Sequence, residues 1–315
     1  MVYYPYIRGK QFELIALRDM CSFIENKNII SPIIEPIKEI NSTIIKTIES
    51  LKSYGINFSI ILNPQEGTIK SSEYTGLIDA VRVEIGEYEN YQPAFIIDES
   101  ISLTEINSYV EKYRLRNISL VINQIPRDEN EFEKLLLSGS IGCVLLRDDD
   151  SAVRRLGRWV KGVEKVLLAE RFNVKVRNAD YANPDDEPFT DDHLFYSKEG
   201  YTGFSDYLTI GNIYKEGGFS PYAVAIHLTY LTDDHKIRIH HFVSDSNDDY
   251  EDVPGKFKEA LAKLIQFIDE EKMQTMACNQ FRQIEKEGSY PGLGSLKKLS
   301  ILNHIELVYR FFAGI

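Results

Sequence analysis

Short, continuous hydrophobic segments rich in β-branched residues recur along the chain, and they constrain its fold more than any other feature. Each one ends at, or is directly followed by, a polar or charged residue, and a loop comes next. Strands without polar alternation are typical of parallel sheets, which are buried on both faces. The sequence predicts six such strands, at residues 29–37, 58–63, 94–99, 118–124, 143–147 and 166–171.

Helical segments separate several of the predicted strands. Residues 42–54 place Ile48 and Leu51 on one face. This segment follows Asn41 and stops at Gly55, which are helix start and stop signals in the right order. Because alternating strands and helices form right-handed crossovers, the strands are expected to pair in parallel. Further helices are predicted at residues 103–113, 130–138 and 152–162.

The predicted fold class is therefore α/β, a TIM-barrel-like (β/α) barrel. Six successive strand–helix units favour a closed barrel over an open sheet. No glycine-rich phosphate loop follows the first strand, so the usual signature of a dinucleotide-binding sheet is missing. One domain is expected over residues 1–315, because the sequence shows neither an internal repeat nor a linker.

The regular pattern ends after Arg171, and the C-terminal third is expected to be irregular. Residues 173–203 are polar and acidic and predict a long loop insertion, either a lid over a site or a simple surface insertion. The remaining elements are a short strand, a β-hairpin and terminal helices, predicted at residues 204–211, 222–230 with 236–243, 255–272 and 296–312.

Charge and cysteine content exclude several classes of protein. The formal net charge is −12, and no basic stripe of the kind that binds duplexes is visible, so no broad nucleic-acid surface is expected. Three widely spaced cysteines without a CxxC pair indicate free thiols in a reducing compartment. No apolar run approaches the ~18 residues of a membrane span. We therefore expect a cytoplasmic protein that does not bind membranes.

Four segments carry a resemblance to a known family. They are YYPYIRGKQFELIAL, PIIEPI, FSDYLTIGNIYKEGGFSPYAVAIHLTY and IHHFVSD. Together they resemble an uncharacterised bacterial family related to the phage beta-protein family, over most of the chain. The resemblance implies a part in phage–host conflict, with a nuclease-like protein or a phage component as the partner. It brings no established catalytic residues.

Candidate catalytic residues follow from the predicted barrel, because active sites in this fold lie at the C-terminal ends of the strands. Charged side chains stand at most of these ends. The alternative is that each one caps a helix or solvates a loop. Adjacent strand residues point to opposite faces, so the sequence leaves open which member of each pair faces inward. The candidates are Glu35, Asp98 or Glu99, Arg147, Glu170 or Arg171, and Asp206.

Histidines of the predicted hairpin complete the candidate set. A loop symmetric about Asp233-Asp234 would place His227 directly opposite His240, with Cβ atoms about 4.5–5.5 Å apart. Two such imidazoles could hold a metal with a third ligand, bind phosphate, or act as acid and base. A satisfied cross-strand ring pair is the alternative. Which of His240 and His241 faces the site stays open.

Arg8 and Lys10 stand just before a predicted helix, where they could bind an anionic ligand or cofactor, or simply be solvated. Nothing in the sequence identifies a cofactor, since Walker A, HExxH and nucleophile-elbow motifs are missing. Two functions remain open. One is a ligand- or partner-binding subunit without chemistry. The other is a hydrolase acting on a phosphate-bearing substrate, such as a nucleotide or a phosphodiester.

Overall fold

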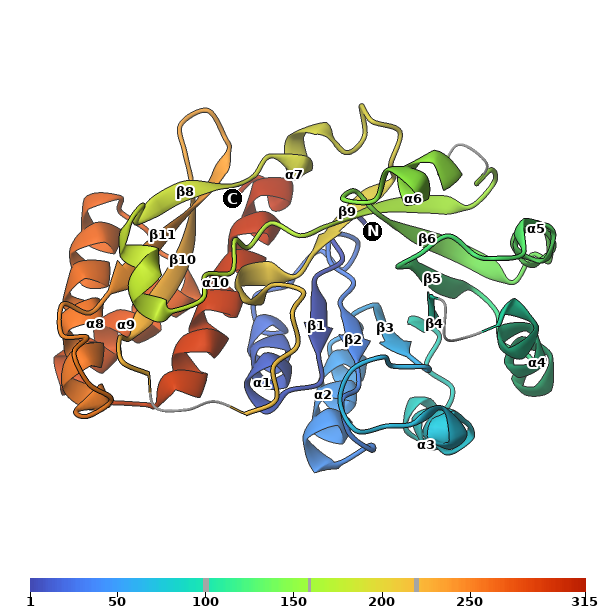
Figure 1. Ribbon diagram of the computed structural model, residues 1–315, viewed down its shortest axis with the longest axis horizontal. Coiled ribbons are helices and arrows are strands. Elements are labelled where there is room, and N and C mark those ends of the chain that lie inside the picture. Colours follow the sequence, from blue (N-terminus) through green and yellow to red (C-terminus); the bar gives the residue numbers. More distant parts are fainter. Residues whose placement is uncertain (99–101, 158–159, 218–220) are drawn as a thin grey trace. The chain divides into compact units, whose positions relative to one another are not determined.

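The computed structural model in Figure 1 describes residues 1–98, 102–157, 160–217 and 221–315. Contacts between residues divide the chain into two compact units. The first unit contains Met1–Leu14, Glu25–Glu170 and Phe195–Asp206. The second unit contains Ile15–Ile24, Arg171–Leu194 and Tyr207–Ile315. The single domain expected over residues 1–315 remains a prediction.

The first unit is built on an eight-stranded parallel sheet that follows the sequence order. The segment before the first strand links the two ends of this sheet and so nearly closes it into a barrel. Its residue Tyr3 forms parallel bridges to both Ile30 and Phe204. The expected TIM-barrel-like α/β fold is thus confirmed as a nearly closed barrel. Its strands are β1 (Tyr6–Arg8), β2 (Ile33–Glu35), β3 (Phe58–Ile61), β4 (Tyr91–Ile97), β5 (Ile118–Ile122), β6 (Ile141–Arg147), β7 (Glu164–Ala169) and β9 (Gly203–Asp206).

Helices connect most of these strands, and those predicted at residues 42–54, 103–113 and 130–138 are confirmed. Helix α2 begins where Asn41 caps it, since the Asn41 side chain accepts from the backbone N–H groups of Thr43 and Ile44. The sixth helix is shorter than residues 152–162, and residues 158 and 159 lie outside the described part of the chain. The helices are α1 (Gln11–Met20), α2 (Ser42–Ser53), α3 (Tyr74–Ile85), α4 (Leu103–Tyr113), α5 (Glu129–Leu137) and α6 (Ser151–Leu156), with the 3-10 turn η1 (Ser71–Glu73).

The second unit pairs a three-stranded antiparallel sheet with long helices. Its strand order is β10-β11-β8, and α10 packs against β10 while α8 packs against β11. The strands are β8 (Asp186–Thr190), β10 (Ala225–Leu231) and β11 (Ile237–Val243). The helices are α7 (Asp192–Phe195), whose last residue belongs to the first unit, α8 (Val253–Glu270), α9 (Met276–Glu287) and α10 (Leu293–Ala313), with 3-10 turns η2 (Asn178–Ala182) and η3 (Leu208–Ile210).

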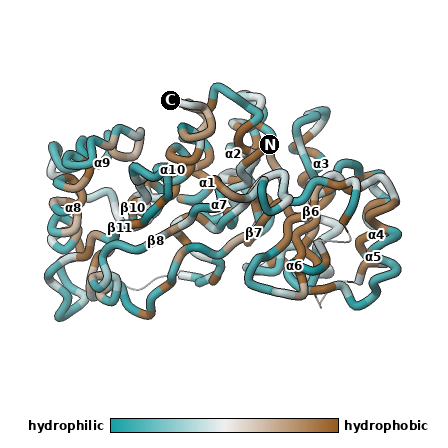
Figure 2. Tube along the Cα trace, turned by 90° about the horizontal axis from the view of Figure 1, so that it is seen from above, coloured by the Kyte–Doolittle hydropathy of each residue, from teal (hydrophilic) through white to brown (hydrophobic). Residues whose placement is uncertain are grey.

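Hydrophobic residues gather on the buried elements of each unit. Figure 2 shows them along the barrel strands near β6 and β7, whereas α9 is hydrophilic over much of its length. All three cysteines are buried thiols outside any disulfide, and Cys143 lies within β6. No helix in the described ranges is both long and apolar enough to cross a lipid bilayer.

The segment expected to be a long loop, residues 173–203, contains regular structure. It forms η2, the edge strand β8 and α7. Strand β8 was missed because it starts with two acidic residues, Asp186 and Glu187, which are depleted in strands. Pro188 is tolerated there because an edge strand needs no ladder hydrogen bond on its outer side. The acidic residues instead pair with side chains of β11.

Candidate functional site

The β10–β11 hairpin differs by one residue from the expected register. The expectation paired His227 with His240. In the structure His227 lies opposite His241, and Leu231 lies opposite Ile237. The one-residue difference turns His240 to the other face of the sheet, because successive strand side chains alternate between faces. The expected pairing is therefore wrong, and a different histidine takes the place of His240.

The loop explains the change of register. The expected loop was symmetric about Asp233-Asp234 and paired Leu231 with Lys236. Instead, the backbone N–H of Thr232 donates to the carbonyl of Lys236 at 2.9 Å, which closes a three-residue loop. His235 ends this loop with a φ of 62°, in the left-handed region. Three-residue hairpin loops require one residue in this conformation, and their odd length shifts the register by one.

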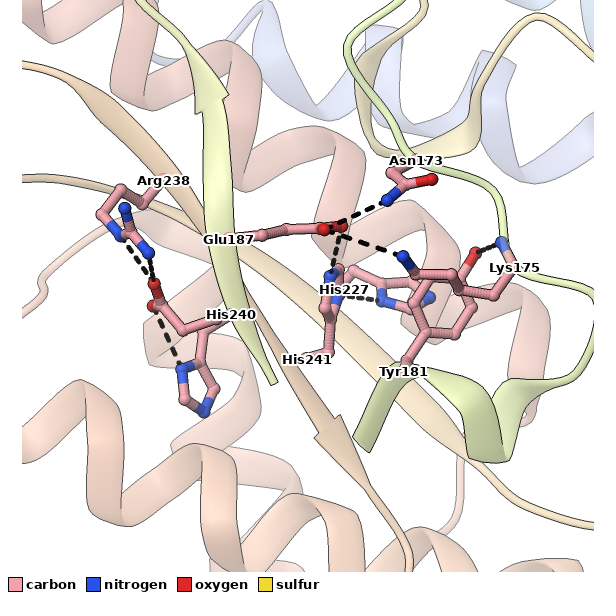
Figure 3. Close-up of polar contacts among 9 residues, drawn as sticks. Asn173, Lys175, Tyr181, Glu187, His227, Arg238, His240 and His241 are labelled. Atoms are coloured by element: carbon pink, nitrogen blue, oxygen red, sulfur yellow. Dashed lines mark hydrogen bonds and ion pairs between the residues drawn. The ribbon is translucent and has the colours of Figure 1, made fainter. Parts of the chain in front are cut away.

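A chain of hydrogen bonds connects His227, His241 and Glu187 (Figure 3). The Nδ1 atoms of His227 and His241 lie 2.8 Å apart. The Nε2 atom of His241 lies 3.2 Å from Oε1 of Glu187. Since a carboxylate only accepts, His241 donates from Nε2, and in its neutral form its Nδ1 then accepts. His227 must therefore donate from Nδ1, which leaves a lone pair on its Nε2.

Two polar side chains hold Glu187 in place. Asn173 Nδ2 donates to Oε2 of Glu187 at 3.1 Å, and Lys175 Nζ lies 3.8 Å from the same oxygen. The hydroxyl of Tyr181 accepts from the backbone N–H of Lys175 at 3.0 Å, which fixes the segment that carries both residues. Both oxygens of Glu187 are thus engaged. The carboxylate is oriented before any ligand arrives.

Aromatic rings enclose the two imidazoles. Phe172 lies edge-on to His227, with ring centroids 5.0 Å apart, and Tyr181 lies 4.5 Å from His227 and 4.9 Å from His241. Burial, together with the neighbouring His241, lowers the pKa of His227 to about 3. Burial also lowers the pKa of His241, although Glu187 opposes that shift. Both rings are therefore neutral at neutral pH.

A pocket of about 230 Å³ opens beside His227 within the second unit. Besides His227 and Phe172, its lining includes Thr209 of η3 and Lys297 and Ser300 of α10. The Thr209 side chain is buried, and its hydroxyl has no hydrogen-bond partner among the described residues. The pocket thus combines an imidazole, a cation and two hydroxyl groups, which is a set of groups that can bind and transform a small polar ligand.

The opposite face of the same sheet carries a second histidine–carboxylate pair. His240 Nδ1 lies 3.4 Å from Oδ2 of Asp186, which also accepts from the hydroxyl of Tyr230 at 2.7 Å. Arg238 Nε donates to Oδ1 of Asp186 at 2.6 Å. The His240 ring stacks on Phe267 with centroids 4.7 Å apart. Figure 3 shows Arg238 and His240 on the side of β8 away from Glu187 and His241.

In the barrel, Glu35 is buried at the end of β2, where both of its carboxylate oxygens are engaged. Oε2 accepts from the Tyr6 hydroxyl at 2.8 Å and lies 3.8 Å from Nε of Arg8. Oε1 accepts from the backbone N–H groups of Gln65 at 2.9 Å and Glu66 at 3.3 Å. These contacts tie the loop after β3 to the barrel rim. Its catalytic role remains a prediction.

The other candidates at strand ends lie in varied surroundings. Asp206, buried at the end of β9, accepts from the Tyr3 hydroxyl at 2.9 Å. Arg147 ends β6 and is paired with Asp149, whose Oδ1 lies 2.9 Å from Nε of Arg147. Asp98 follows β4 and is partly exposed. Glu99, its alternative, lies outside the described residues.

The remaining candidates lie at the ends of β7 and β1 or in the residues that follow these strands. Glu170 follows β7 and belongs to the first unit, whereas Arg171 belongs to the second, where it forms a bidentate pair with Asp192 at 2.7 Å. Arg8 ends β1 and is buried, and Lys10 is partly exposed just before α1. The structure brings none of these residues into the His227 pocket. Their proposed roles in catalysis and anion binding stay predictions.

Sequence reasoning missed Glu187 and Thr209 and named His241 only as an alternative to His240. One signal could have found Glu187. Two adjacent acidic residues on one strand, facing two adjacent histidines on its neighbour, give one acid–histidine pair on each face of a sheet. The hydroxyl of Thr209 gave no signal, because its position beside the pocket depends on packing between distant segments. In the described part of the chain, no three metal-binding side chains come together as a site.

No family model matches the chain, and no curated protein matches it. The resemblance to the phage beta-protein family therefore stays a prediction. Among solved structures, the crystal structure of the Bacillus cereus spore cortex-lytic enzyme SleL is similar over 96% of this chain and 74% of that chain, with 11% sequence identity and a TM-score of 0.30.

Proposed function

We propose that this chain is a hydrolase that acts on a phosphate-bearing substrate, with His227 as the general base. The observation that supports this most strongly is the hydrogen-bonded chain from Glu187 through His241, which leaves the Nε2 lone pair of His227 for a ligand. A base held in one tautomer by a second group, itself oriented by a carboxylate, is the arrangement that activates a nucleophile in hydrolases.

The chemistry is direct. A water molecule beside His227 loses a proton to Nε2, its oxygen forms a bond to phosphorus, and the bond from phosphorus to the leaving oxygen breaks. The positive charge that develops on His227 is stabilised through His241 by the Glu187 carboxylate. In a nucleotide anhydride the leaving group is itself a phosphate that departs as an anion. A nucleotide therefore suits this mechanism better than a substrate whose leaving group needs an acid.

The low pKa of His227 sets a condition on this mechanism. An imidazole with a pKa of about 3 is a weak base at neutral pH. A bound phosphate would bring negative charge close to the ring, and a nearby anion raises the pKa of a histidine. His227 thus becomes a stronger base when a phosphate-bearing substrate occupies the pocket.

Hydrolysis of a panel of nucleotides and phosphodiesters tests the proposal, measured as phosphate release for the nucleotides and as formation of the phosphomonoester for the diesters. The assay compares the wild type with His227→Gln. We expect the variant to lose about 10²–10⁴-fold in rate, the usual contribution of a general base. His235→Asn is the matched control, because His235 lies exposed in the hairpin loop and asparagine tolerates its left-handed backbone. Equal rates in all three proteins would reject His227 as the base.

The second candidate function is a ligand- or partner-binding subunit without chemistry. It is favoured by one observation: the described lining of the pocket holds a proton acceptor but no carboxyl group that could act as an acid. In that case the pocket serves recognition alone. If the chain is a binding subunit, a ligand should stabilise the wild type, and no member of the panel should be hydrolysed. Partners of the kind that the family resemblance implies remain part of this proposal.

A further inference from the structure

We infer that the pocket beside His227 is a subsite for a phosphate group, bound by the Thr209 hydroxyl, the Lys297 ammonium group and the first turn of α10. The inference deepens the proposed function. It rests on that function in one respect: that the phosphate bound in this pocket is part of the substrate.

The Thr209 hydroxyl is the first observation that points to a ligand. The residue is only 4% exposed, and its Oγ1 has no hydrogen-bond partner among the described residues. Buried polar atoms nearly always have a partner, because leaving one without any is costly. Since Thr209 lines the pocket, rotation of its side chain toward a ligand there would give the hydroxyl a partner. A phosphate oxygen is an acceptor that suits it.

The charge of the lining is the second observation. The formal net charge of the chain is −12, yet the described lining of this pocket contains Lys297 and no carboxylate. The surrounding side chains His227 and Ser300 are neutral donors or acceptors. A pocket with a cation and without acidic groups selects an anion against the overall charge of the protein.

The start of α10 is the third observation. The helix begins at Leu293 after Gly292, which provides no side-chain cap for the first N–H groups. Leu293 and Leu296 of this first turn line the pocket together with Lys297. Uncapped N–H groups and the positive end of the helix dipole favour an anion at this position. The helix start therefore acts together with Thr209 and Lys297.

The size of the pocket limits what enters it. Its volume of about 230 Å³ is below the ~300–1,000 Å³ of sites that enclose drug-sized ligands. A whole nucleotide does not fit within it, whereas a terminal phosphate group does. The inferred substrate class is thus a molecule with a terminal phosphate at one end, whose remaining part lies outside the pocket.

Inorganic phosphate is the probe that tests the subsite, with binding to the full-length chain measured by calorimetry. We expect Lys297→Met and Thr209→Val each to weaken phosphate binding by about tenfold or more, the value of one hydrogen bond to a charged group. Thr209→Ser keeps the hydroxyl and should bind as the wild type does. Lys286→Met, at an exposed position of α9, is the control for loss of one positive charge.

The outcomes separate the inference from the proposed function. Phosphate binding that depends on Thr209 and Lys297 supports the subsite even if no substrate is hydrolysed, in which case only the proposed function fails. Suppose that hydrolysis requires His227 but that Lys297→Met binds phosphate as tightly as the control Lys286→Met does. That result overturns the subsite and leaves the proposed function standing. No binding of phosphate to the wild type also overturns the subsite.

Discussion

The Nδ1 atoms of His227 and His241 lie 2.8 Å apart across the β10–β11 pair. One ring must donate and the other must accept, because two neutral imidazoles share only one proton at this contact. Glu187 decides the direction, since it can only accept from His241. The relationship therefore fixes both tautomers and leaves a lone pair on Nε2 of His227, which is one of the residues that line the pocket.

Replacing Glu187 tests whether its carboxylate positions the base. Glu187→Gln removes the negative charge and supplies an amide N–H that can donate to His241, which favours the opposite tautomers. We expect kcat to fall by about 10²–10⁴-fold while KM changes little, because the carboxylate does not touch the substrate. Steady-state kinetics on the best substrate of the panel measures both. A change confined to KM would contradict the positioning role.

Asp186→Asn is the companion experiment on the opposite face of the same strand. Asp186 accepts from Tyr230 and Arg238 and lies beside His240. Replacing its carboxylate by an amide should lower the free energy of unfolding by about 1–3 kcal/mol, since the donors of Tyr230 and Arg238 lose a charged acceptor. The rate of hydrolysis by folded protein should stay unchanged. Denaturant unfolding and the phosphate-release assay check the two effects. A variant that keeps its stability but loses activity would move the site to the His240 face.

The depressed pKa of His227 predicts how stability depends on pH. The folded-state pKa is about 3 against an ordinary 6.5, so the unfolded chain binds the proton more readily. The contribution of His227 is complete above the ordinary value and is lost as the pH falls from there toward the folded value. At about pH 5 the loss is on the order of 2 kcal/mol. Comparing the free energy of unfolding of wild type and His227→Gln, at neutral pH and at about pH 5, isolates the contribution of His227.

The variant provides the control for this pH effect. Carboxylates elsewhere titrate equally in both proteins, so their contributions cancel in the difference between wild type and His227→Gln. We expect the wild type to lose more stability on acidification than the variant. An equal loss in both would mean that His227 is not held neutral by burial.

Glu35 in the barrel is expected to stabilise the folded protein. A glutamine there has one acceptor oxygen, whereas Glu35 uses both of its oxygens, one for the Tyr6 hydroxyl and one for the backbone N–H of Gln65. Glu35→Gln should therefore cost about 1–3 kcal/mol in unfolding free energy. Phosphate release per folded molecule should not change. Loss of activity in a variant as stable as the wild type would instead place chemistry at the barrel rim.

The barrel could be predicted from the sequence because its strands are buried on both faces. Their continuous apolar runs, such as residues 118–124, differ from any loop or amphipathic helix nearby, and caps such as Asn41 mark the helices between them. The exception is β1 (Tyr6–Arg8), where Tyr6 and Arg8 flank one aliphatic residue, so it has no continuous apolar run.

The candidate site was harder to predict, because it depends on a register and on an edge strand. One residue in the left-handed region, His235, changes the loop length and replaces His240 by His241 opposite His227. The sequence around His235 contains no glycine that would indicate this conformation. Glu187 lies in an acidic segment that resembles a loop until β11 pairs with it. Local sequence patterns do not show such distant pairing.

The tautomers of His227 and His241 are the most direct test of this account. Long-range nitrogen–proton correlation spectra of the protein with labelled histidine report which ring nitrogen carries the proton. At neutral pH we predict that His227 is protonated on Nδ1 and His241 on Nε2, with Nε2 of His227 unprotonated. Protonation of His227 on Nε2 would contradict it, because no lone pair would then remain to accept a proton from the substrate water.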